Sequence, residues 1–308
     1  MGCTASAIAS FPSAATWRAM GSHVVVEVVG PSDLLVQARA RLAELEQRWS
    51  RFLPDSDVTR LNTTRGLPVF VHGDTRRLVR HAIEAWKRTG GACDASVLDA
   101  VVASGYDRSF EALGATVGRD AAVVVPGCDG IVVDDELGSV TLPSGTGFDP
   151  GAIGKGLAAD LVVEELLAAG ADGAFVSIGG DLRMGGRPAK GDGWLVDVVD
   201  HERSATVVAR LALSGGAVAT STTQRRRWSV EGEPRHHVID PATGTCADTG
   251  LRTATVVAGE AWWAEALATQ LLLAPESEWA RIVGDGVAVA IDQDGGRHLL
   301  GSIDRYLR

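Results

Sequence analysis

Apolar and polar residues alternate along this chain with two periods, one typical of strands and one typical of helices. Successive side chains of a strand point to opposite faces, so short alternating or β-branched runs predict strands. These runs cover residues 23–29, 123–125, 131–133, 139–142, 174–178, 194–199, 205–213, 253–257, 287–291 and 298–300. Apolar residues that recur every three or four positions share one face of a helix. Such patterns predict helices over residues 33–49, 75–89, 157–170 and 260–273, and a short helical stretch that ends near residue 104.

The order of these elements favours an α+β fold. A doubly wound parallel sheet needs strict alternation of strand and helix, and here the two kinds of element intermingle without it. Residues 49–62 are rich in turn formers, aromatic residues and charge, and we interpret them as a loop. No repeat, low-complexity linker or clear domain boundary divides the chain. We expect a disordered lead over residues 1–15 and a folded domain over residues 16–308.

Composition places the chain among globular proteins and argues against nucleic-acid binding. It has 308 residues, of which 45% are hydrophobic and 22% are charged, so it can bury a substantial core. The formal net charge is −10, from 29 basic and 39 acidic residues. A nucleic-acid-binding surface normally has an excess of basic residues. This excess of acidic residues is compatible with a bound metal ion or with a locally basic pocket.

The cysteines and the N-terminal segment indicate the compartment. Four cysteines lie far apart and form no C-x-x-C pair: Cys3, Cys93, Cys128 and Cys246. Scattered thiols of this kind are typical of a reducing compartment. No apolar run approaches the roughly 20 residues of a membrane-spanning helix. The first 15 residues lack the basic start and apolar core of a signal peptide, and no hydrophobic segment precedes Cys3 as in a lipobox. We therefore expect a cytoplasmic protein without a membrane span.

A glycine-rich segment, residues 147–156, precedes the helix predicted over residues 157–170. It combines Asp149 and Lys155 with four glycines and a proline. Glycines let the backbone approach a ligand closely, and a helix N-terminus attracts anions, so a phosphate-bearing ligand fits here. The segment is neither a Walker loop nor a G-x-G-x-x-G motif. A tight turn in which glycine serves geometry alone remains the alternative.

Two further groups of residues suggest chemistry. Glu265 and Thr269 lie four residues apart and share one helix face, where a carboxylate and a hydroxyl suit a hard cation such as Mg²⁺. An ordinary helix with one polar spot is the alternative. His236 and His237 are consecutive and cannot easily share a metal, but one of them could act as a general base beside the turn at residues 240–244. A satisfied surface histidine fits equally well.

Residues 215–223 and 225–227 border this region. The first segment is small and rich in hydroxyl groups, and we interpret it as a loop. The second is a run of three arginines, which we interpret as a solvated edge strand.

The order of these motifs resembles that of the ApbE-type FAD:protein FMN transferases, over residues 16–273. Eight collinear elements carry the resemblance, and their residue types are those of the family pattern. They are Met20-Gly21, the Ser-Arg-Phe-x-Pro pattern with its Leu-Asn over residues 50–62, Asp-Ala-Ser-Val at 94–97, the Asp-x-Gly-x-Ile-x-Lys-Gly-x-x-x-Asp pattern at 149–160, Gly-Gly-Asp at 179–181, Ala-Thr-Ser at 219–221, His-x-Ile-Asp-Pro-x-Thr-Gly at 237–244 and the segment 264–269.

The resemblance implies a fold, a reaction and a set of site residues. The fold would be α+β and T-fold-like, with residues 16–308 forming a single compact catalytic domain of two lobes. The reaction would transfer FMN from FAD to a threonine hydroxyl on the FMN-binding domain of an acceptor protein, releasing AMP. The residues lining the FAD site would be Met20, Phe52, Ala92, Cys93, Asp94, Asp149, Lys155 and Val238. The Mg²⁺ ligands would be the Ala152 carbonyl, the Glu265 carboxylate and the Thr269 hydroxyl, and His237 would be the base.

Two residues depart from the family pattern. Glu265 stands where the metal-binding acid is usually Asp, and Phe52 stands where the flavin-contacting residue is usually Tyr. Glutamate is one methylene longer, and phenylalanine keeps the stacking face but lacks the hydroxyl. Two alternative functions follow from these departures and from the chemistry. One is a Mg²⁺-dependent FAD pyrophosphatase that produces FMN and AMP, and the other is a non-catalytic FAD-binding protein.

Overall fold

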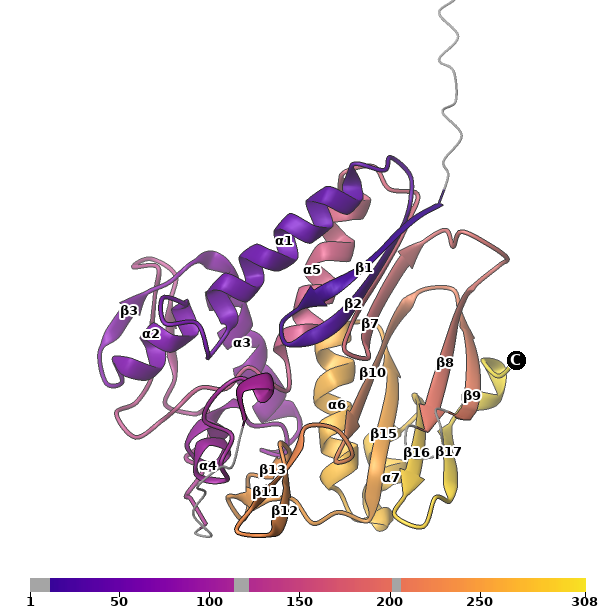
Figure 1. The fold of residues 1–308 in the computed structure, drawn as a ribbon. Coiled ribbons are helices and arrows are strands. Elements are labelled where there is room, and N and C mark those ends of the chain that lie inside the picture. Colours follow the sequence, from indigo (N-terminus) through magenta and orange to yellow (C-terminus); the bar gives the residue numbers. More distant parts are fainter. Residues whose placement is uncertain (1–11, 114–121, 201–205) are drawn as a thin grey trace, which may run out of the picture.

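An antiparallel sheet of eight strands lies at the centre of the computed structural model, which describes residues 12–113, 122–200 and 206–308 (Figure 1). The strand order is β1-β2-β6-β7-β10-β15-β16-β17. The strands are β1 (Pro12–Ala19), β2 (Ser22–Val29), β6 (Gly173–Ile178), β7 (Asp181–Gly186), β10 (Gly216–Thr222), β15 (Leu251–Ala258), β16 (Val287–Asp292) and β17 (Arg297–Gly301). Every neighbouring pair in this sheet is antiparallel, which excludes a doubly wound sheet.

Helices cover one face of the sheet, and a β-hairpin covers part of the other (Figure 1). The helices are α1 (Leu34–Trp49), α2 (Asp57–Thr63), α3 (Gly73–Arg88), α4 (Leu98–Ala103), α5 (Gly154–Ala168), α6 (Ala261–Leu273) and α7 (Glu276–Val283). The hairpin is β8 (Trp194–Asp200) with β9 (Thr206–Leu213). Within the described ranges, every helix is too short or too polar to cross a membrane.

The alternation of side chains along a strand explains why both faces are buried. In β16, Val287 and Val289 join the cluster under the β8–β9 hairpin, whereas Ala288 and Ala290 join the cluster under α6 and α7. Consecutive residues thus contact different layers, as the two-residue period of a strand requires. Small alanines on the helix side allow α6 to approach the sheet closely.

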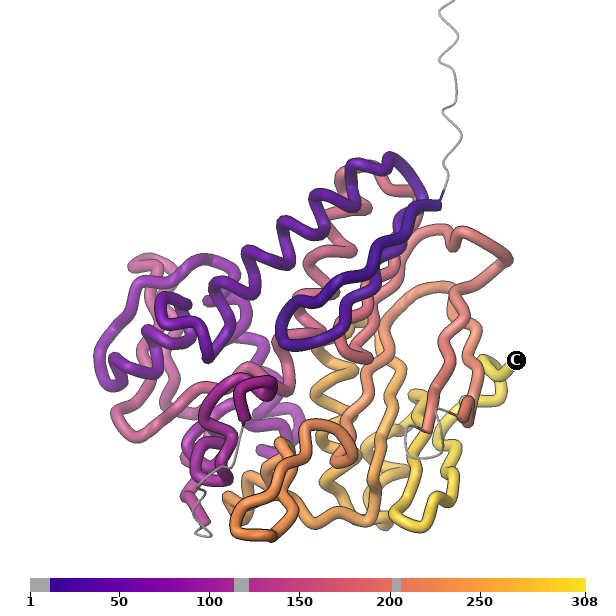
Figure 2. The backbone as a smooth tube through the Cα atoms, viewed as in Figure 1, coloured from indigo at the N-terminus to yellow at the C-terminus, as the bar shows by residue number. Residues whose placement is uncertain are grey.

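The chain leaves the sheet after β2 and returns to it at β6, as the tube in Figure 2 shows. Between these strands it forms α1 to α5 and a three-stranded sheet of β3 (Pro68–Phe70), β5 (Ser139–Thr141) and β4 (Val132–Asp134). Side chains of this excursion, such as Leu78 and Val140, belong to the same buried cluster as Leu157 of α5 and Val26 of the main sheet. The predicted α+β fold in a single compact domain is therefore confirmed.

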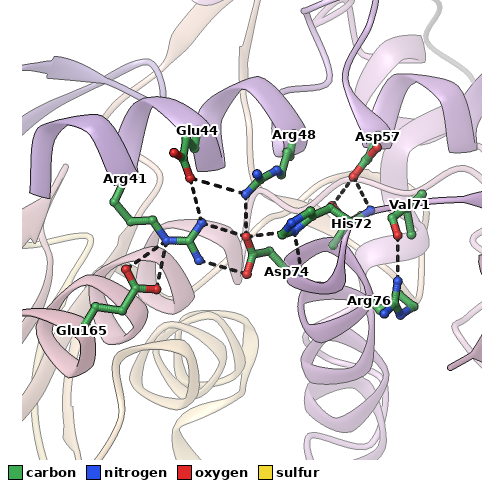
Figure 3. A network of polar contacts seen from close by, with 10 residues as sticks. Arg41, Glu44, Arg48, Asp57, Val71, His72, Asp74, Arg76 and Glu165 are labelled. Carbon is green, nitrogen blue, oxygen red and sulfur yellow. Dashed lines mark hydrogen bonds and ion pairs between the residues drawn. The ribbon is translucent and has the colours of Figure 1, made fainter. Parts of the chain in front are cut away.

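A polar network holds α1, α3 and α5 together (Figure 3). Arg41 of α1 donates two hydrogen bonds to the Asp74 carboxylate of α3, at 2.8 and 2.9 Å, and one to Glu165 of α5 at 2.9 Å. Arg48 adds a bond of 2.6 Å to Asp74. Burial alone would raise the pKa of Asp74, but the hydrogen bonds and charge of Arg41 lower it below its ordinary value. The ionised form of Asp74 thus links three helices of the excursion to one another.

One boundary prediction is wrong. The predicted lead of residues 1–15 includes Pro12 to Ala15, which form the first half of β1 and pair with β2 from Val29 to Val26. Alternating small and apolar residues gave this segment no strong strand signal, and its structure depends on the neighbouring strand. The remainder of the predicted lead, residues 1–11, lies outside the described residues.

Other local predictions also need correction. The segment predicted as a loop over residues 49–62 contains most of α2, which starts where the Ser56 hydroxyl accepts a bond of 2.9 Å from the Thr59 N–H. Residues 123–125 do not form a strand, although the Val123 N–H bonds the Gly244 carbonyl at 3.3 Å. The hydroxyl-rich segment 215–223 contains the central strand β10. Helix α7 and strand β3 were not predicted.

The three arginines begin a short hairpin outside the main sheet. Arg227 is the first residue of β11 (Arg227–Val230), which pairs with β12 (Glu233–His236). The next hairpin along the chain is β13 (Ile239–Asp240) with β14 (Thr245–Cys246), which closes the turn after His237.

Candidate active site

A lysine between two buried carboxylates forms the centre of the site. Lys155 lies in the first turn of α5, Asp181 begins β7, and Glu265 lies in α6. The Lys155 ammonium donates hydrogen bonds to both carboxylates. The second Glu265 oxygen accepts a bond of 2.8 Å from the Gly156 N–H. Asp181 is 2% exposed and Glu265 is 3% exposed, so three charged groups from distant segments meet inside the molecule.

Burial and mutual charge set the protonation of these groups. Burial raises the pKa of Glu265 above its ordinary value, and the negative charge of Asp181 acts in the same direction, while Lys155 opposes it. Burial would lower the pKa of Lys155, but the two carboxylates raise it above its ordinary value. The ammonium therefore stays charged, and the acidic pair has a strong need for a cation.

Hydroxyl and carbonyl oxygens lie beside this centre. Thr269, one helical turn after Glu265, donates a bond of 3.1 Å to the Glu265 carbonyl, and its hydroxyl lies 3.0 Å from the Ser221 hydroxyl of β10. The Ala152 carbonyl, just before α5, accepts a weak bond from the Cys93 thiol at 3.8 Å. The negative charge of Glu265 helps burial to raise the pKa of Cys93, which places that thiol and carbonyl near the carboxylate.

These donors fit a hard cation. All of them are oxygen atoms, which Mg²⁺ prefers, and the two carboxylates already share a positive group in Lys155. Across the described ranges, no group of three or more His, Cys, Asp or Glu side chains could hold a metal ion. A metal at this place would therefore depend on hydroxyl, carbonyl and water or phosphate oxygens in addition to carboxylates, which is usual for Mg²⁺ and unusual for Zn²⁺.

Asp160 of α5 fixes the position of α6. Its two carboxylate oxygens accept bonds of 2.8 and 2.9 Å from the N–H groups of Ala261 and Trp262, the first residues of α6. Arg183 of β7 forms an ion pair with it at 3.1 Å. Burial raises the pKa of Asp160 to about 6, although these bonds and the Arg183 charge oppose the rise. Because α6 carries Glu265 and Thr269, Asp160 positions both.

Gly156 allows the two helices to approach this closely. A Cβ atom added there would lie 2.4 Å from the Ala261 carbonyl oxygen and 2.7 Å from the Trp262 nitrogen. These backbone atoms cannot move away without shifting α6. Gly156, the last of the four glycines in the predicted phosphate segment, thus serves helix packing.

The loop that contains Asp149 is held from both sides. Asn62 brackets Phe148, because its side-chain amide donates to the Phe148 carbonyl at 2.8 Å and accepts from the Phe148 N–H at 2.7 Å. One Asp149 oxygen accepts a bond of 2.8 Å from the Gly151 N–H, and the other lies 3.3 Å from Arg51. These contacts fix the backbone around Phe148 and the side chain of Asp149.

Aromatic rings gather next to Asp149. The ring centroids of Phe52 and Tyr106 lie 5.8 Å apart, and those of Tyr106 and Trp228 lie 5.4 Å apart. The Arg51 guanidinium lies over both Phe52 and Tyr106, at 4.2 and 4.5 Å from their centroids. Phe52 is 38% exposed, so one face of its ring can receive a flat ligand. Tyr106 brings a ring with a phenol hydroxyl next to Phe52. In the family pattern described above, a tyrosine occupies the position of Phe52 itself.

His237 is neutral and partly unsatisfied. Burial lowers its pKa to about 3, and the positive charges of Arg226 and Lys155 act in the same direction. Among the described residues, its Nδ1 atom has no hydrogen-bond partner. The influence of Lys155 places this histidine near the acid–lysine centre. Its neighbour His236 instead contacts the Ala247 carbonyl at 3.1 Å.

The remaining predicted residues have defined partners. The Met20 N–H donates to Glu46 at 2.7 Å, and Met20 has a positive φ of 51°. Asp94 accepts bonds from the Ser96 N–H at 2.7 Å and from the Cys128 thiol at 3.4 Å, and it is 6% exposed. The Val238 carbonyl accepts from the Ala247 N–H at 3.0 Å. Ala92 lies in the turn after α3.

Sequence reasoning did not assign several residues that the structure brings to this region. These residues are Arg51, Tyr106, Asp160, Asp181, Ser221 and Arg226. Four of them belong to motifs that were quoted from the sequence: Arg51, Asp160, Asp181 and Ser221. Those motifs could have drawn attention to the residues, but they did not indicate what each residue does. Tyr106 and Arg226 had no such signal.

Fold and site together define an α+β protein in which a lysine between two buried carboxylates lies near a cluster of aromatic rings. The chain belongs to the ApbE family, whose sequence profile matches residues 20–291. The resemblance inferred from the eight motifs is thereby confirmed. The match covers most of the site residues described above, from Met20 to Thr269.

Named relatives and solved structures agree with this assignment. The chain is 28% identical over 285 residues to a Salmonella typhimurium protein named FAD:protein FMN transferase, with 88% of this chain and 81% of the relative covered. An Escherichia coli protein of the same name is 26% identical over 289 residues, covering 89% and 80% of the two chains. The crystal structure of the ApbE protein from Thermotoga maritima superposes with a TM-score of 0.86 at 26% identity, covering 96% and 99%. The flavin transferase ApbE from Vibrio cholerae, at 22% identity and a TM-score of 0.80, shares the fold over 97% and 100%.

Proposed function

We propose that this protein is a FAD:protein FMN transferase that moves FMN from FAD to a threonine hydroxyl of a partner flavoprotein and releases AMP. Enzymes of that name are its relatives over four fifths of their length. The observation that carries the proposal is the convergence of Lys155, two buried carboxylates and the neutral His237 next to an aromatic pocket. The proposed reaction requires contacts for a cation, for phosphate groups and for flat rings, and it requires a base. The residues of this arrangement are suited to each of these roles.

FAD has two flat ring systems joined by a diphosphate, and the site offers matching surfaces. The exposed face of Phe52 suits a flat ring, with Met20, Val238 and the segment 92–94 as further lining. The Lys155 ammonium suits the diphosphate, since it lies at the start of α5, where the helix N-terminus favours an anion. Asp149, fixed by Arg51, would accept a hydrogen bond from a ligand N–H or O–H group.

The transfer is a displacement at phosphorus. The acceptor threonine oxygen attacks the phosphorus of the FMN half, and the bond from that phosphorus to the bridging oxygen breaks. AMP leaves with the bridging oxygen, and the hydroxyl proton passes to His237. His237 can receive it because it is neutral and Nδ1 has no partner among the described residues. A bound diphosphate is anionic, so it would raise the low pKa of His237 and make the imidazole a better base.

Mg²⁺ would be held by the Glu265 carboxylate, the Thr269 hydroxyl and the Ala152 carbonyl. When bound, it supplies a positive charge that draws electron density from the diphosphate. Asp181 lies in the same cluster and adds a second carboxylate. Glutamate at position 265 still reaches this centre, as its contacts with Lys155 and Gly156 indicate. The longer side chain is therefore compatible with the cation site.

The acceptor would be a protein with an FMN-binding domain that presents a threonine to this site. We assign the activity to the folded domain, which was predicted over residues 16–308 and which β1 extends to Pro12. We further propose a cytoplasmic setting. Cys93, Cys128 and Cys246 are free thiols, which supports a reducing compartment.

Incubation with FAD, Mg²⁺ and a candidate FMN-binding domain tests the proposal. Covalent flavin fluorescence on the acceptor, lost when its threonine is replaced by alanine, would support transfer. Release of AMP and FMN without labelled protein would identify the pyrophosphatase instead. FAD bound without either product would identify a non-catalytic binder. EDTA in a parallel reaction measures the dependence on the metal.

A further inference from the structure

Arg226 reaches from the turn before β11 to the turn between β1 and β2. Its guanidinium lies 3.4 Å from the Gly21 carbonyl oxygen and 3.3 Å from the Ser22 hydroxyl. Both distances are long for hydrogen bonds, so these contacts are weak. Within the described ranges, no ion pair joins Arg226 to a carboxylate. Most other arginines near the site have an acidic partner, as Arg51 has Asp149 and Arg183 has Asp160.

The backbone at this contact is strained on both sides. Arg226 has a φ of 50° and Met20 has a φ of 51°, and residues other than glycine rarely adopt such backbone angles. A Cβ atom added at Gly21 would lie 3.7 Å from the Arg226 guanidinium, so the two turns approach closely. Strained residues of this kind persist where the surrounding structure holds them, and they concentrate at ligand sites.

The guanidinium, held at the β1–β2 turn, is close enough to both halves of the site to affect their ionisation. Its charge helps burial to lower the pKa of His237. Burial raises the pKa of Tyr106, and the charges of Arg226 and Arg51 oppose that rise. Arg226 therefore acts on both the proposed base and the aromatic pocket. A cation that faces a neutral histidine and lacks an acidic partner is well placed to receive an anion.

We infer that Arg226 binds a phosphate oxygen of FAD and sets the position of the diphosphate against His237. The inference rests on the proposed function and assigns it a further substrate-binding residue. An arginine fork matches phosphate geometry and can keep one nitrogen on the β1–β2 turn while the other donates to the ligand. The strained turn at Arg226 then serves to aim this side chain into the site.

The variant Arg226→Gln tests this with FAD and riboflavin as probes, because riboflavin has the flavin ring and no phosphate. We expect about 10- to 100-fold weaker FAD binding by equilibrium dialysis, as for a lost charge-assisted hydrogen bond. Riboflavin affinity should change by less than about twofold. Arg227→Gln is the matched control, because Arg227 is exposed and bonds the Gln224 side chain at 3.1 Å. It should leave FAD affinity within about twofold.

A second readout separates ligand binding from a structural role. Removal of the Arg226 charge should raise the pKa of His237, measured by NMR on the ligand-free protein, whereas Arg227→Gln should leave it unchanged. Arg226→Gly relieves the positive φ and removes the guanidinium, so it should weaken FAD binding without lowering the unfolding temperature. Equal loss of FAD and riboflavin affinity, or FAD affinity kept in Arg226→Gln, would overturn the inference and leave the proposed function intact. A wild-type protein that does not bind FAD would overturn both.

Discussion

The charge state of His237 links local burial to the reaction. The imidazole is neutral because burial and the nearby cations Arg226 and Lys155 disfavour its protonated form. A neutral ring can accept a proton from a threonine hydroxyl, whereas a protonated ring cannot. The same environment makes it a weak base until an anionic substrate arrives. Under the proposed function, substrate binding and base strength would be coupled through the electrostatics of His237.

His237→Ala should abolish transfer and keep FAD binding. The methyl group removes the proton acceptor, while Lys155, Phe52 and the glycine-rich segment still contact the ligand. We expect the rate of acceptor labelling to fall by about 10²- to 10⁴-fold, which is the usual contribution of general-base catalysis. Time-resolved flavin fluorescence on the acceptor measures the rate, and equilibrium dialysis measures the FAD affinity. If FAD binding is lost as well, His237 is a ligand contact and its assignment as base fails.

Glu265→Gln tests the metal assignment. The amide keeps the size of the side chain and removes its charge, so the affinity for Mg²⁺ should fall by more than about tenfold. Lys155 retains Asp181 as a partner, so the protein should still fold. Calorimetric titration with Mn²⁺ as the probe measures the affinity directly. Glu265→Asp is the matched control, because it restores the usual acid of the family, and it should retain Mn²⁺ binding. Full Mg²⁺-dependent activity in the Gln variant would contradict the assignment.

At this scale, motif spacing could identify Lys155, Glu265, Thr269 and His237 as candidates, because each belongs to a recognised pattern. It could not identify Arg226. That residue matters through its contact with a turn about 200 positions earlier in the chain, and a run of three arginines gives no sign of which one points inward. Its role depends on a backbone conformation that sequence periodicity does not encode.

At the scale of elements, the placement of α6 governs the site. The helix is apolar on nearly all sides, since eight of its thirteen residues are buried, among them Glu265. Its sequence pattern therefore predicts a helix but not which face meets which neighbour. The buried cap from Asp160 and the glycine contact at Gly156 fix its position against α5. Gly156 and Asp160 occur in one motif, and their spacing of four residues places both on the same face of α5.

Asp160→Ala should destabilise the fold and weaken the metal site together. It leaves two buried N–H groups and Arg183 without their partner, which should cost about 3–5 kcal/mol, as for breaking a buried charged pair. Denaturant unfolding measures this loss, and Mn²⁺ titration measures the effect on Glu265. Asp172→Ala is a matched control, because Asp172 is exposed, and it should cost less than about 1 kcal/mol. A stable Asp160→Ala protein with an intact metal site would show that α6 is held by apolar packing alone.

The raised pKa of Asp160 gives a pH test of the same contact. The folded value of about 6 exceeds the ordinary value of 3.8, so between these values the folded state holds more protons than the unfolded state. Stability from this group is therefore complete below pH 3.8 and decreases as pH rises through 6. Asp160→Asn has no such proton. The difference in unfolding free energy, wild type minus variant, should fall by about 2–3 kcal/mol between pH 4 and pH 7. A difference that stays constant would refute the pKa shift.

Most helices and strands could be predicted from the sequence, and the strands that were missed were missed for a common reason. Strand β3 and the first half of β1 exist because they pair with β5 and β2, and their own residues carry weak patterns. Strand β10 is rich in small and hydroxyl residues because α6 packs on it, so it resembles a loop in sequence. In each case tertiary contact overrides local propensity, as it commonly does for strands.

At the scale of the whole molecule, the site is assembled across one continuous core. Its residues come from the β1–β2 turn, the loop after α1, the start of α5, the start of β7 and the middle of α6. They are separated by up to 249 positions, between Met20 and Thr269. No shorter segment contains the site. The excursion and the sheet share one hydrophobic cluster, so they should unfold in a single transition.

Ligand binding should therefore stabilise the entire chain in one step. FAD with Mg²⁺ at about 100 times the dissociation constant adds about 2.7 kcal/mol to the free energy of unfolding, because only the folded state has the site. For a chain of this size we expect a rise of about 5 °C in the unfolding temperature. Differential scanning calorimetry with FAD and Mg²⁺, and with EDTA replacing Mg²⁺, measures the shift and its dependence on the metal.

Variants make this whole-molecule test specific. His237→Ala should keep the full stabilisation, since it removes a base and not a ligand contact, whereas Glu265→Gln should lose the Mg²⁺-dependent part. Two separate transitions, of which only one moves with FAD, would show that the excursion and the sheet fold independently. A site built from one of them alone would then suffice for binding, contrary to the shared core. We instead expect a single transition that shifts with FAD, because the site needs both the excursion and the sheet. Lys155 joins Asp181 of the sheet to Glu265 of α6, and Asp149 of the preceding loop forms an ion pair with Arg51 of the excursion.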